Sequence, residues 1–188
     1  DRSGNYEVNW SSYAFIYDAS SPTVKLVMPV ASAYNSLGSI SGTGSDNVGI
    51  SLVEVRILDK KSAPNKYWNN ILETWQNDTV LVASAAWYSN SGMNQAGNWS
   101  QWRSTFTLDG VVDRWLSGYD YQVEARGIDL AGLRDMITST CNFVYDSSAP
   151  VMMITQPSNG SYYSALVSIS GTTTDYPKTP YSNSAIVD

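Results

Sequence analysis

The sequence predicts an all-β protein built of antiparallel β-sandwich modules in tandem, and two observations carry that prediction. The first is a repeat: YDASSPTVKLVMP at residues 17–29 aligns with YDSSAPVMMITQP at residues 145–157. A second pair of blocks follows in the same order, SISGTGSD at residues 39–46 and SISGTTTD at residues 168–175. The other observation is that apolar and polar residues alternate between these blocks, which is the period of strands with one buried face. Short strands separated by turn residues favour an antiparallel sandwich.

The repeat divides the chain into one complete module and parts of two others. The offset between the matched blocks is 128 residues for the first pair and 129 for the second, so the two pairs are nearly in register. We therefore expect residues 1–17 to be the final strand of a preceding module and residues 18–145 to be a complete module. Residues 146–188 are then the opening strands of a following module, and the chain is expected to belong to a longer tandem array.

Apolar residues spaced by two mark the expected strands of the complete module. In chain order they are Val24, Leu26 and Met28; Ile40; Val53, Val55 and Ile57; Ser104, Phe106 and Leu108; Tyr119, Tyr121, Val123 and Ala125; and Ile137, Cys141 and Phe143. Turn-forming sequences such as Asp109-Gly110 and Ser117-Gly118 separate these runs. The face that carries Cys141 and Phe143 is expected to be buried.

The middle of the module departs from this pattern. Trp68, Ile71, Leu72 and Trp75 are spaced as on one face of a helix, although two Asn residues and the short length weaken that interpretation. We therefore expect residues 60–78 to form an irregular Trp-rich insertion that includes a helical turn. Residues 79–88 are expected to resume as a strand.

Composition excludes several classes of function. The chain has 188 residues, a formal charge of −6 and a pI near 4.5, which argues against nucleic acid or an anionic membrane surface as a partner. It contains no His and a single Cys, Cys141, so Ser-His-Asp sites, Cys-His sites, ordinary zinc sites and intrachain disulfides are excluded. The remaining residues suggest no catalytic constellation, and the sequence predicts a protein that is not an enzyme.

Several blocks resemble the bacterial immunoglobulin-like modules of long, repetitive proteins that are secreted or anchored to the cell surface. They are the linker YDASSP, SISGTGSDNVGISLVEVRI at residues 39–57 and YQVEARGIDLAG at residues 121–132. The Trp-rich sequences at residues 67–75 and 98–102 also belong to this resemblance. The resemblance covers residues 18–145 completely and implies an immunoglobulin-like β-sandwich, with an extracellular or cell-surface location.

Two positions refine the resemblance. The chain has Leu133 where the family usually has Asn after the final Ala-Gly. Tyr121-Gln122-Val123 is similar to the tyrosine corner of immunoglobulin domains, with Val in place of the usual Cys. The resemblance therefore implies a buried Tyr121 whose hydroxyl bonds to the backbone a few residues upstream.

Aspartates are expected to gather at one end of the sandwich. The entry linker, the loop after the second strand and the loop before the last strand carry Asp18, Asp46 and Asp129, and the following module repeats the first two as Asp146 and Asp175. Calcium binds several carboxylate and carbonyl oxygens, so these residues suggest a calcium site that stiffens the junction between modules. The alternative is that each Asp caps its own turn through backbone hydrogen bonds.

The tryptophans also allow two interpretations. Six of the seven lie between residues 68 and 115, and an exposed pair such as Trp99 and Trp102 would form a platform for stacking sugars. The alternative is that these large rings pack over one face of a sheet. Exposure of the two rings separates the interpretations, because a sugar platform needs faces that are open to solvent.

The favoured function is a structural or adhesive spacer in an extracellular stalk, fibre or filament, and the alternative is a carbohydrate-binding module. The expected partners are neighbouring modules or copies of the same chain, with surface glycans as partners under the alternative. The strands expected in residues 1–17 and 146–188 need cover for their backbone groups. Neighbours in a longer polypeptide would supply it, and strand addition between separate chains is the other possibility.

Overall fold

A computed structural model describes residues 2–6, 9–89, 91–105 and 114–175 of the chain. The strands in this part are β1 (Thr23–Met28), β2 (Ala33–Tyr34), β3 (Ser39–Ser45), β4 (Ile50–Asp59), β5 (Lys66–Asn69), β6 (Thr74–Asn77), β7 (Gln101–Thr105), β8 (Tyr119–Asp129), β9 (Ser139–Tyr145), β10 (Val151–Gln156) and β11 (Ser170–Thr174). A single turn of 3₁₀ helix, Ser91–Met93, is also present. The described residues contain no helix long and apolar enough to cross a membrane.

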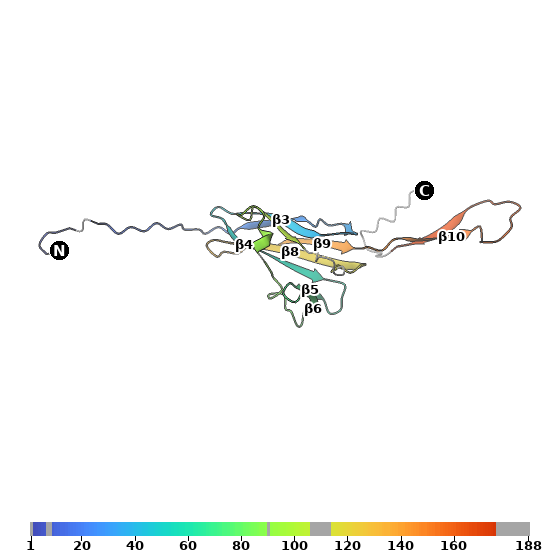
Figure 1. Cartoon of the computed structure of the whole chain (residues 1–188), viewed down its shortest axis with the longest axis horizontal. Coiled ribbons are helices and arrows are strands. Elements are labelled where there is room, and N and C mark those ends of the chain that lie inside the picture. Colours follow the sequence, from blue (N-terminus) through green and yellow to red (C-terminus); the bar gives the residue numbers. More distant parts are fainter. Residues whose placement is uncertain (1, 7–8, 90, 106–113, 176–188) are drawn as a thin grey trace.

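The strands form three sheets, as the all-β prediction required. One sheet has the order β1-β3-β7, and a second has the order β2-β9-β8-β4-β5-β6. All neighbouring strands in these sheets run antiparallel except the short pair β2 and β9. The third sheet is the separate hairpin β10-β11, which projects from one end of the two larger sheets, whereas residues 9–22 lead away from the other end (Figure 1).

The core lies between the two larger sheets and follows the predicted alternation. Val53, Val55 and Ile57 on β4 are fully buried, and Val55 and Ile57 pair with the buried Ala125 and Val123 on β8. From the three-stranded sheet, Val24, Ile40 and Trp102 complete the same buried cluster. Burial of apolar area at about 25 cal/mol per Å² makes this cluster the main source of stability.

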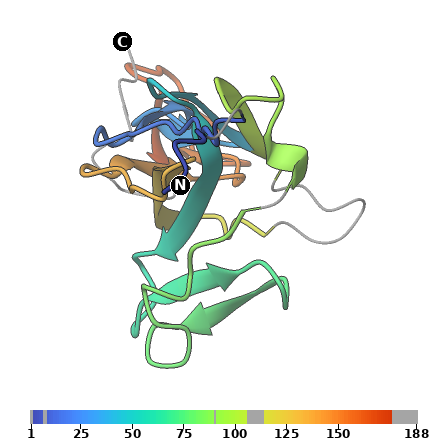
Figure 2. The same cartoon turned by 90° about the vertical axis from the view of Figure 1, so that its left-hand side faces the viewer.

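The Trp-rich insertion contains a β-hairpin formed by β5 and β6. The prediction of a helical turn within residues 60–78 is therefore wrong. Trp68 on β5 pairs directly with Trp75 on β6, and their rings meet edge to face at 5.5 Å between centroids. The turn forms because the Asn69 side-chain oxygen accepts hydrogen bonds from the backbone N–H groups of Ile71 and Leu72, each at 3.0 Å. Ile71 is 91% exposed, so it contributes nothing to a buried helical face. The hairpin extends the six-stranded sheet away from the rest of the sandwich (Figure 2).

The prediction of a strand over residues 79–88 is also wrong. This segment is a series of turns, and only Tyr88 makes a bridge, exchanging two backbone hydrogen bonds of 2.9 Å with Val55. Tyr88 fits there because β5 pairs with β4 only at Leu58 and Asp59, which leaves the edge of β4 open at Val55.

The same segment covers the outer face of the large sheet. The Trp87 ring lies 4.5 Å from the guanidinium carbon of Arg56 and 4.1 Å from that of Arg126. Each of these arginines pairs with a glutamate on the neighbouring strand, Arg56 with Glu124 and Arg126 with Glu54. The polar positions of β4 and β8 are thus paired with one another beneath an aromatic cover.

The last strand is shorter than predicted. Ile137 lies before β9 and is 82% exposed, and Cys141 is only partly buried, whereas Phe143 is buried as expected. The residues before β9 interact with β1 through a side chain and not through strand pairing: the Asp135 carboxylate accepts a hydrogen bond from the Val24 N–H group at 2.8 Å. The hydroxyl of Ser139, the first residue of β9, accepts one from the Leu26 N–H group at 3.0 Å. Ser104 lies on a strand, β7, as expected, and pairs there with Ile40. Phe106 and Leu108 fall outside the described residues.

Candidate metal centre

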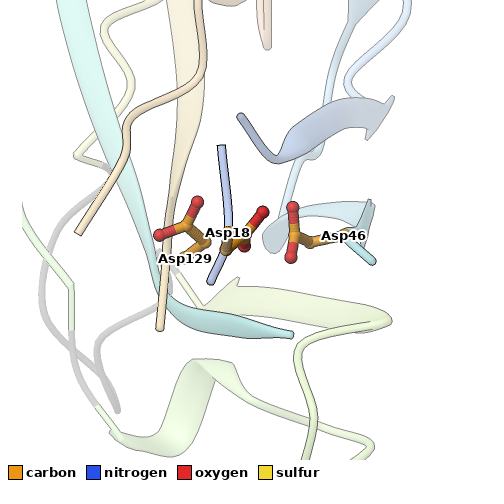
Figure 3. A group of neighbouring side chains, drawn as sticks. All are labelled: Asp18, Asp46 and Asp129. Carbon is orange, nitrogen blue, oxygen red and sulfur yellow. The ribbon is translucent and has the colours of Figure 1, made fainter. Parts of the chain in front are cut away.

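Three aspartates predicted to share one end of the sandwich lie together in the structure. Asp18 is in the entry linker, Asp46 directly follows β3, and Asp129 is the last residue of β8. One carboxylate oxygen from each lies within 4.8 Å of the other two. Figure 3 shows the three side chains next to one another, each carried by a different segment of the chain.

Local hydrogen bonds fix one oxygen of Asp46 and one of Asp129. The Asp46 Oδ2 atom accepts the Val48 and Gly49 N–H groups at 2.8 and 2.9 Å. The Asp129 Oδ1 atom accepts the Leu133 N–H group at 2.8 Å. These are the turn-capping bonds that the sequence allowed as the alternative to a metal site.

Asp18 is held in the same manner, but by the linker and the module together. Its Oδ1 atom accepts the Ser20 N–H group at 3.0 Å and the Ser20 hydroxyl at 2.8 Å. The Asn47 amide donates to the same oxygen at 3.2 Å, and the Ser20 hydroxyl reaches the Asn47 Oδ1 atom at 2.6 Å. Hydrogen bonds to Ser20 keep the pKa of the Asp18 carboxyl below its usual value, so this group is ionised at neutral pH.

The second oxygen of each aspartate has no hydrogen-bond partner. Asp18 Oδ2, Asp46 Oδ1 and Asp129 Oδ2 are all buried without a donor among the described residues. Asp129 as a whole is only 1% exposed. Within the described ranges, no Lys or Arg forms an ion pair with any of the three. The set offers only oxygen atoms, which suits a hard cation and not a transition metal that prefers nitrogen or sulfur.

The other two predicted aspartates are not part of this group. Asp146 lies in the exit linker, where its Oδ1 atom accepts the Ser148 N–H group and hydroxyl and the Ser117 hydroxyl. Asp175 follows β11 and is exposed. Among the described residues, neither Asp146 nor Asp175 belongs to a group of three acids close enough to share an ion.

The two tryptophans considered as a sugar platform lie inside the sandwich. Trp102 is 1% exposed and Trp99 is 7% exposed. The Trp102 ring packs against Gly42, where an added Cβ would lie only 2.4 Å from the ring, and its Nε1 atom donates to the Thr43 carbonyl at 3.3 Å. Neither ring has the open face that stacking on a sugar needs.

One residue of the site was not singled out in the sequence. Asn47 ties the linker to the loop after β3, and its only sequence signal was its place in the Asp46–Gly49 turn. Comparison with known proteins adds no assignment. The chain matches no protein-family model and no protein of curated function.

Proposed function

We propose that this chain is part of a tandem array of immunoglobulin-like β-sandwich modules and acts as a non-enzymatic structural or adhesive spacer. The array would belong to a repetitive protein that is secreted or anchored at the cell surface. The observation that carries the proposal is that the hairpin β10-β11 repeats the pairing of β1 with β3.

The repeat holds pair by pair. Leu26 pairs with Gly42, and Ile154 pairs with Gly171, the residues that the sequence alignment places at the same positions. All the other aligned pairs agree, and both hairpins have an irregularity at the same step, after Leu26 and after Ile154. A hairpin with the strand register of a complete module supports its identity as the start of another one.

The strand order supports an immunoglobulin-like module. Variable-type immunoglobulin domains pack a smaller sheet against a larger one in which two extra strands extend the central pair. Here β5 and β6 extend the β9-β8-β4 sheet in that way, and β1-β3-β7 form the smaller sheet. The Tyr121 hydroxyl accepts the Leu116 N–H group at 2.7 Å, which has the form of a tyrosine corner.

Both linkers are fixed to the module, which suits a spacer of limited bending. At the entry, Asp18 and Ser20 bond to Asn47. At the exit, Asp146 and the Ser147 N–H group bond to the Ser117 hydroxyl, at 2.9 and 3.0 Å. Because linker and module share side-chain hydrogen bonds at both ends, neighbouring modules would keep a preferred orientation.

The partners in this proposal are neighbouring modules of the array, or further copies of the chain. The burial of Trp99 and Trp102 counts against the alternative of a carbohydrate-binding module, since that function relied on exposed rings. Surface glycans therefore have no binding platform at these two positions.

Single-molecule force spectroscopy tests the proposal. The chain is held at its two ends and pulled, and a spacer should unfold in one discrete event. Residues 18–145 extend at about 3.6 Å per residue, which gives about 46 nm before the folded length is subtracted. Gradual extension without a force peak would contradict a load-bearing role, and specific binding of a soluble oligosaccharide would support the alternative.

A further inference from the structure

We infer that Asp18, Asp46 and Asp129 bind a calcium ion that ties the entry linker to the sandwich. Two oxygens bound to one calcium ion, each 2.3–2.6 Å from it, can be at most about 5 Å apart. The three carboxylate oxygens lie within 4.8 Å of one another, so an ion at their centre would be at most about 2.8 Å from each, and small side-chain movements would bring all three into contact with it. The linker, the loop after β3 and the end of β8 each bring one of these side chains to the same place (Figure 3).

Turn capping gives hydrogen-bond partners to only one of the two oxygens of each carboxylate. The capping bonds use Asp46 Oδ2 and Asp129 Oδ1 and leave the other oxygen of each buried and without a donor. A buried carboxylate oxygen without a partner is costly, and Asp129 is 99% removed from solvent. Three carboxylates this close repel one another, and a cation among them would offset the repulsion and could supply the contacts that the unpartnered oxygens lack.

The chemistry of the site favours calcium over magnesium. Calcium accepts six to eight oxygens in flexible geometry, whereas magnesium requires a near-ideal octahedron and keeps several waters. Here the three carboxylates come from three separate segments, which gives an irregular arrangement and leaves positions for carbonyl oxygens or water. Their three negative charges exceed the two positive charges of the ion, so its charge is fully compensated.

The site joins two parts of the chain with different roles. Asp46 and Asp129 belong to the sandwich, whereas Asp18 belongs to the linker that precedes β1. Calcium would therefore hold the linker on the module more firmly than the hydrogen bonds from Asn47 and Ser20 do alone. The inference does not depend on the spacer function, because the ion would bind to this chain whatever the array does.

Calorimetric titration of the whole chain with CaCl2 tests the site. We expect a single site per chain with a Kd of about 10⁻⁴ to 10⁻³ M, the range of extracellular calcium modules, and weaker binding of MgCl2. Asp129→Asn keeps an oxygen to accept the Leu133 N–H group but removes one charge, and should weaken calcium binding at least about tenfold. Asp146→Asn is the control for loss of a carboxylate. Like Asp18, Asp146 bonds to the Ser two residues later, but it lies outside the cluster.

A second variant, Asp18→Asn, tests the site even if Asp129→Asn disturbs folding. Asp18→Asn lies outside the sandwich, so this variant should fold as the wild type does while losing calcium affinity. Hydrogen exchange of the Ser20 amide, which bonds to Asp18, should slow with calcium in the wild type and not in Asp18→Asn.

Three results would overturn the inference: no binding heat up to about 10 mM CaCl2, Asp129→Asn binding calcium as tightly as the wild type, or magnesium binding as tightly as calcium. None of these would bear on the spacer proposal, which rests on strand register and on the response to force.

Discussion

Replacing Tyr121 with Phe tests the packing of the exit end of the sandwich. Tyr121 is fully buried, and its hydroxyl is the acceptor for the Leu116 N–H group at 2.7 Å. Phe keeps the ring and its contacts with Trp115 and Phe143, at 4.8 and 5.6 Å between centroids. The substitution therefore isolates the hydroxyl. Losing one partly buried hydrogen bond and leaving its donor unsatisfied should cost about 1–2 kcal/mol.

Urea denaturation followed by tryptophan fluorescence measures this cost. The transition midpoint should fall while the slope of the free energy with urea stays unchanged, because the surface exposed on unfolding is the same. Tyr119→Phe is the matched control: it lies two residues away on β8, and its hydroxyl makes no hydrogen bond within the described part of the chain. Equal midpoints for the two variants, or for Tyr121→Phe and the wild type, would refute the argument that the Tyr121 hydroxyl stabilises this end.

Three further predictions concern pH, packing and cooperativity. Burial raises the pKa of Tyr88 to about 12 and that of Tyr121 further, so the folded state holds these protons above pH 10 while the unfolded state releases them. Stability should then fall as pH rises above about 10, less steeply in Tyr121→Phe, as urea midpoints across that range would reveal. Gly42→Ala should destabilise the chain by about 1–3 kcal/mol in thermal denaturation because its Cβ would collide with the Lys25 carbonyl oxygen at 2.0 Å and the Trp102 ring at 2.4 Å. At the matching Gly171 the Cβ would meet the Met153 carbonyl oxygen at 2.7 Å and no buried ring, so Gly171→Ala should disturb the hairpin β10-β11 and leave the melt of the sandwich unchanged. A fragment of residues 18–145 should unfold in one cooperative transition, and different midpoints by fluorescence and circular dichroism would count against these boundaries.

The strands that could be predicted are those with one face in the core. The central parts of β4, residues 53–57, and of β8, residues 119–126, alternate between apolar and polar residues, because one face packs on the other sheet and the other carries the Arg–Glu pairs. The gathering of Asp18, Asp46 and Asp129 followed from the same order of strands, since their loops come to one end of an antiparallel sandwich. Sequence alone could not reveal which oxygen of each carboxylate lacks a donor.

The hairpin β5-β6 was hidden by an ambiguity of spacing. Residues seven apart lie on one side of a helix, but they also lie opposite each other across a hairpin of suitable turn length, as Trp68 and Trp75 do. The turn depends on Asn69, whose side-chain bonds to the next turn residues replace a helix with a reversal of direction. The burial of Trp102 could not be predicted from the sequence either. Gly42 leaves room for the Trp102 ring, and the two residues meet only because β3 pairs with β7.

The segments that enter and leave the sandwich, which are linkers under the proposed array, bond to it in different ways. Asp18 and Asp146 each bond to the Ser two residues later, so their local conformations agree. Within the described residues, Asp18 joins a carboxylate cluster with Asp46 and Asp129 of the sandwich that follows it, and Asp146 joins none. Asp146 is held instead by Ser117, which belongs to the sandwich that precedes it. In an array, each linker aspartate would thus have two sets of neighbours, one from the module it leaves and one from the module it enters. A linker held from both sides transmits orientation from module to module, which a flexible linker of the same length would not.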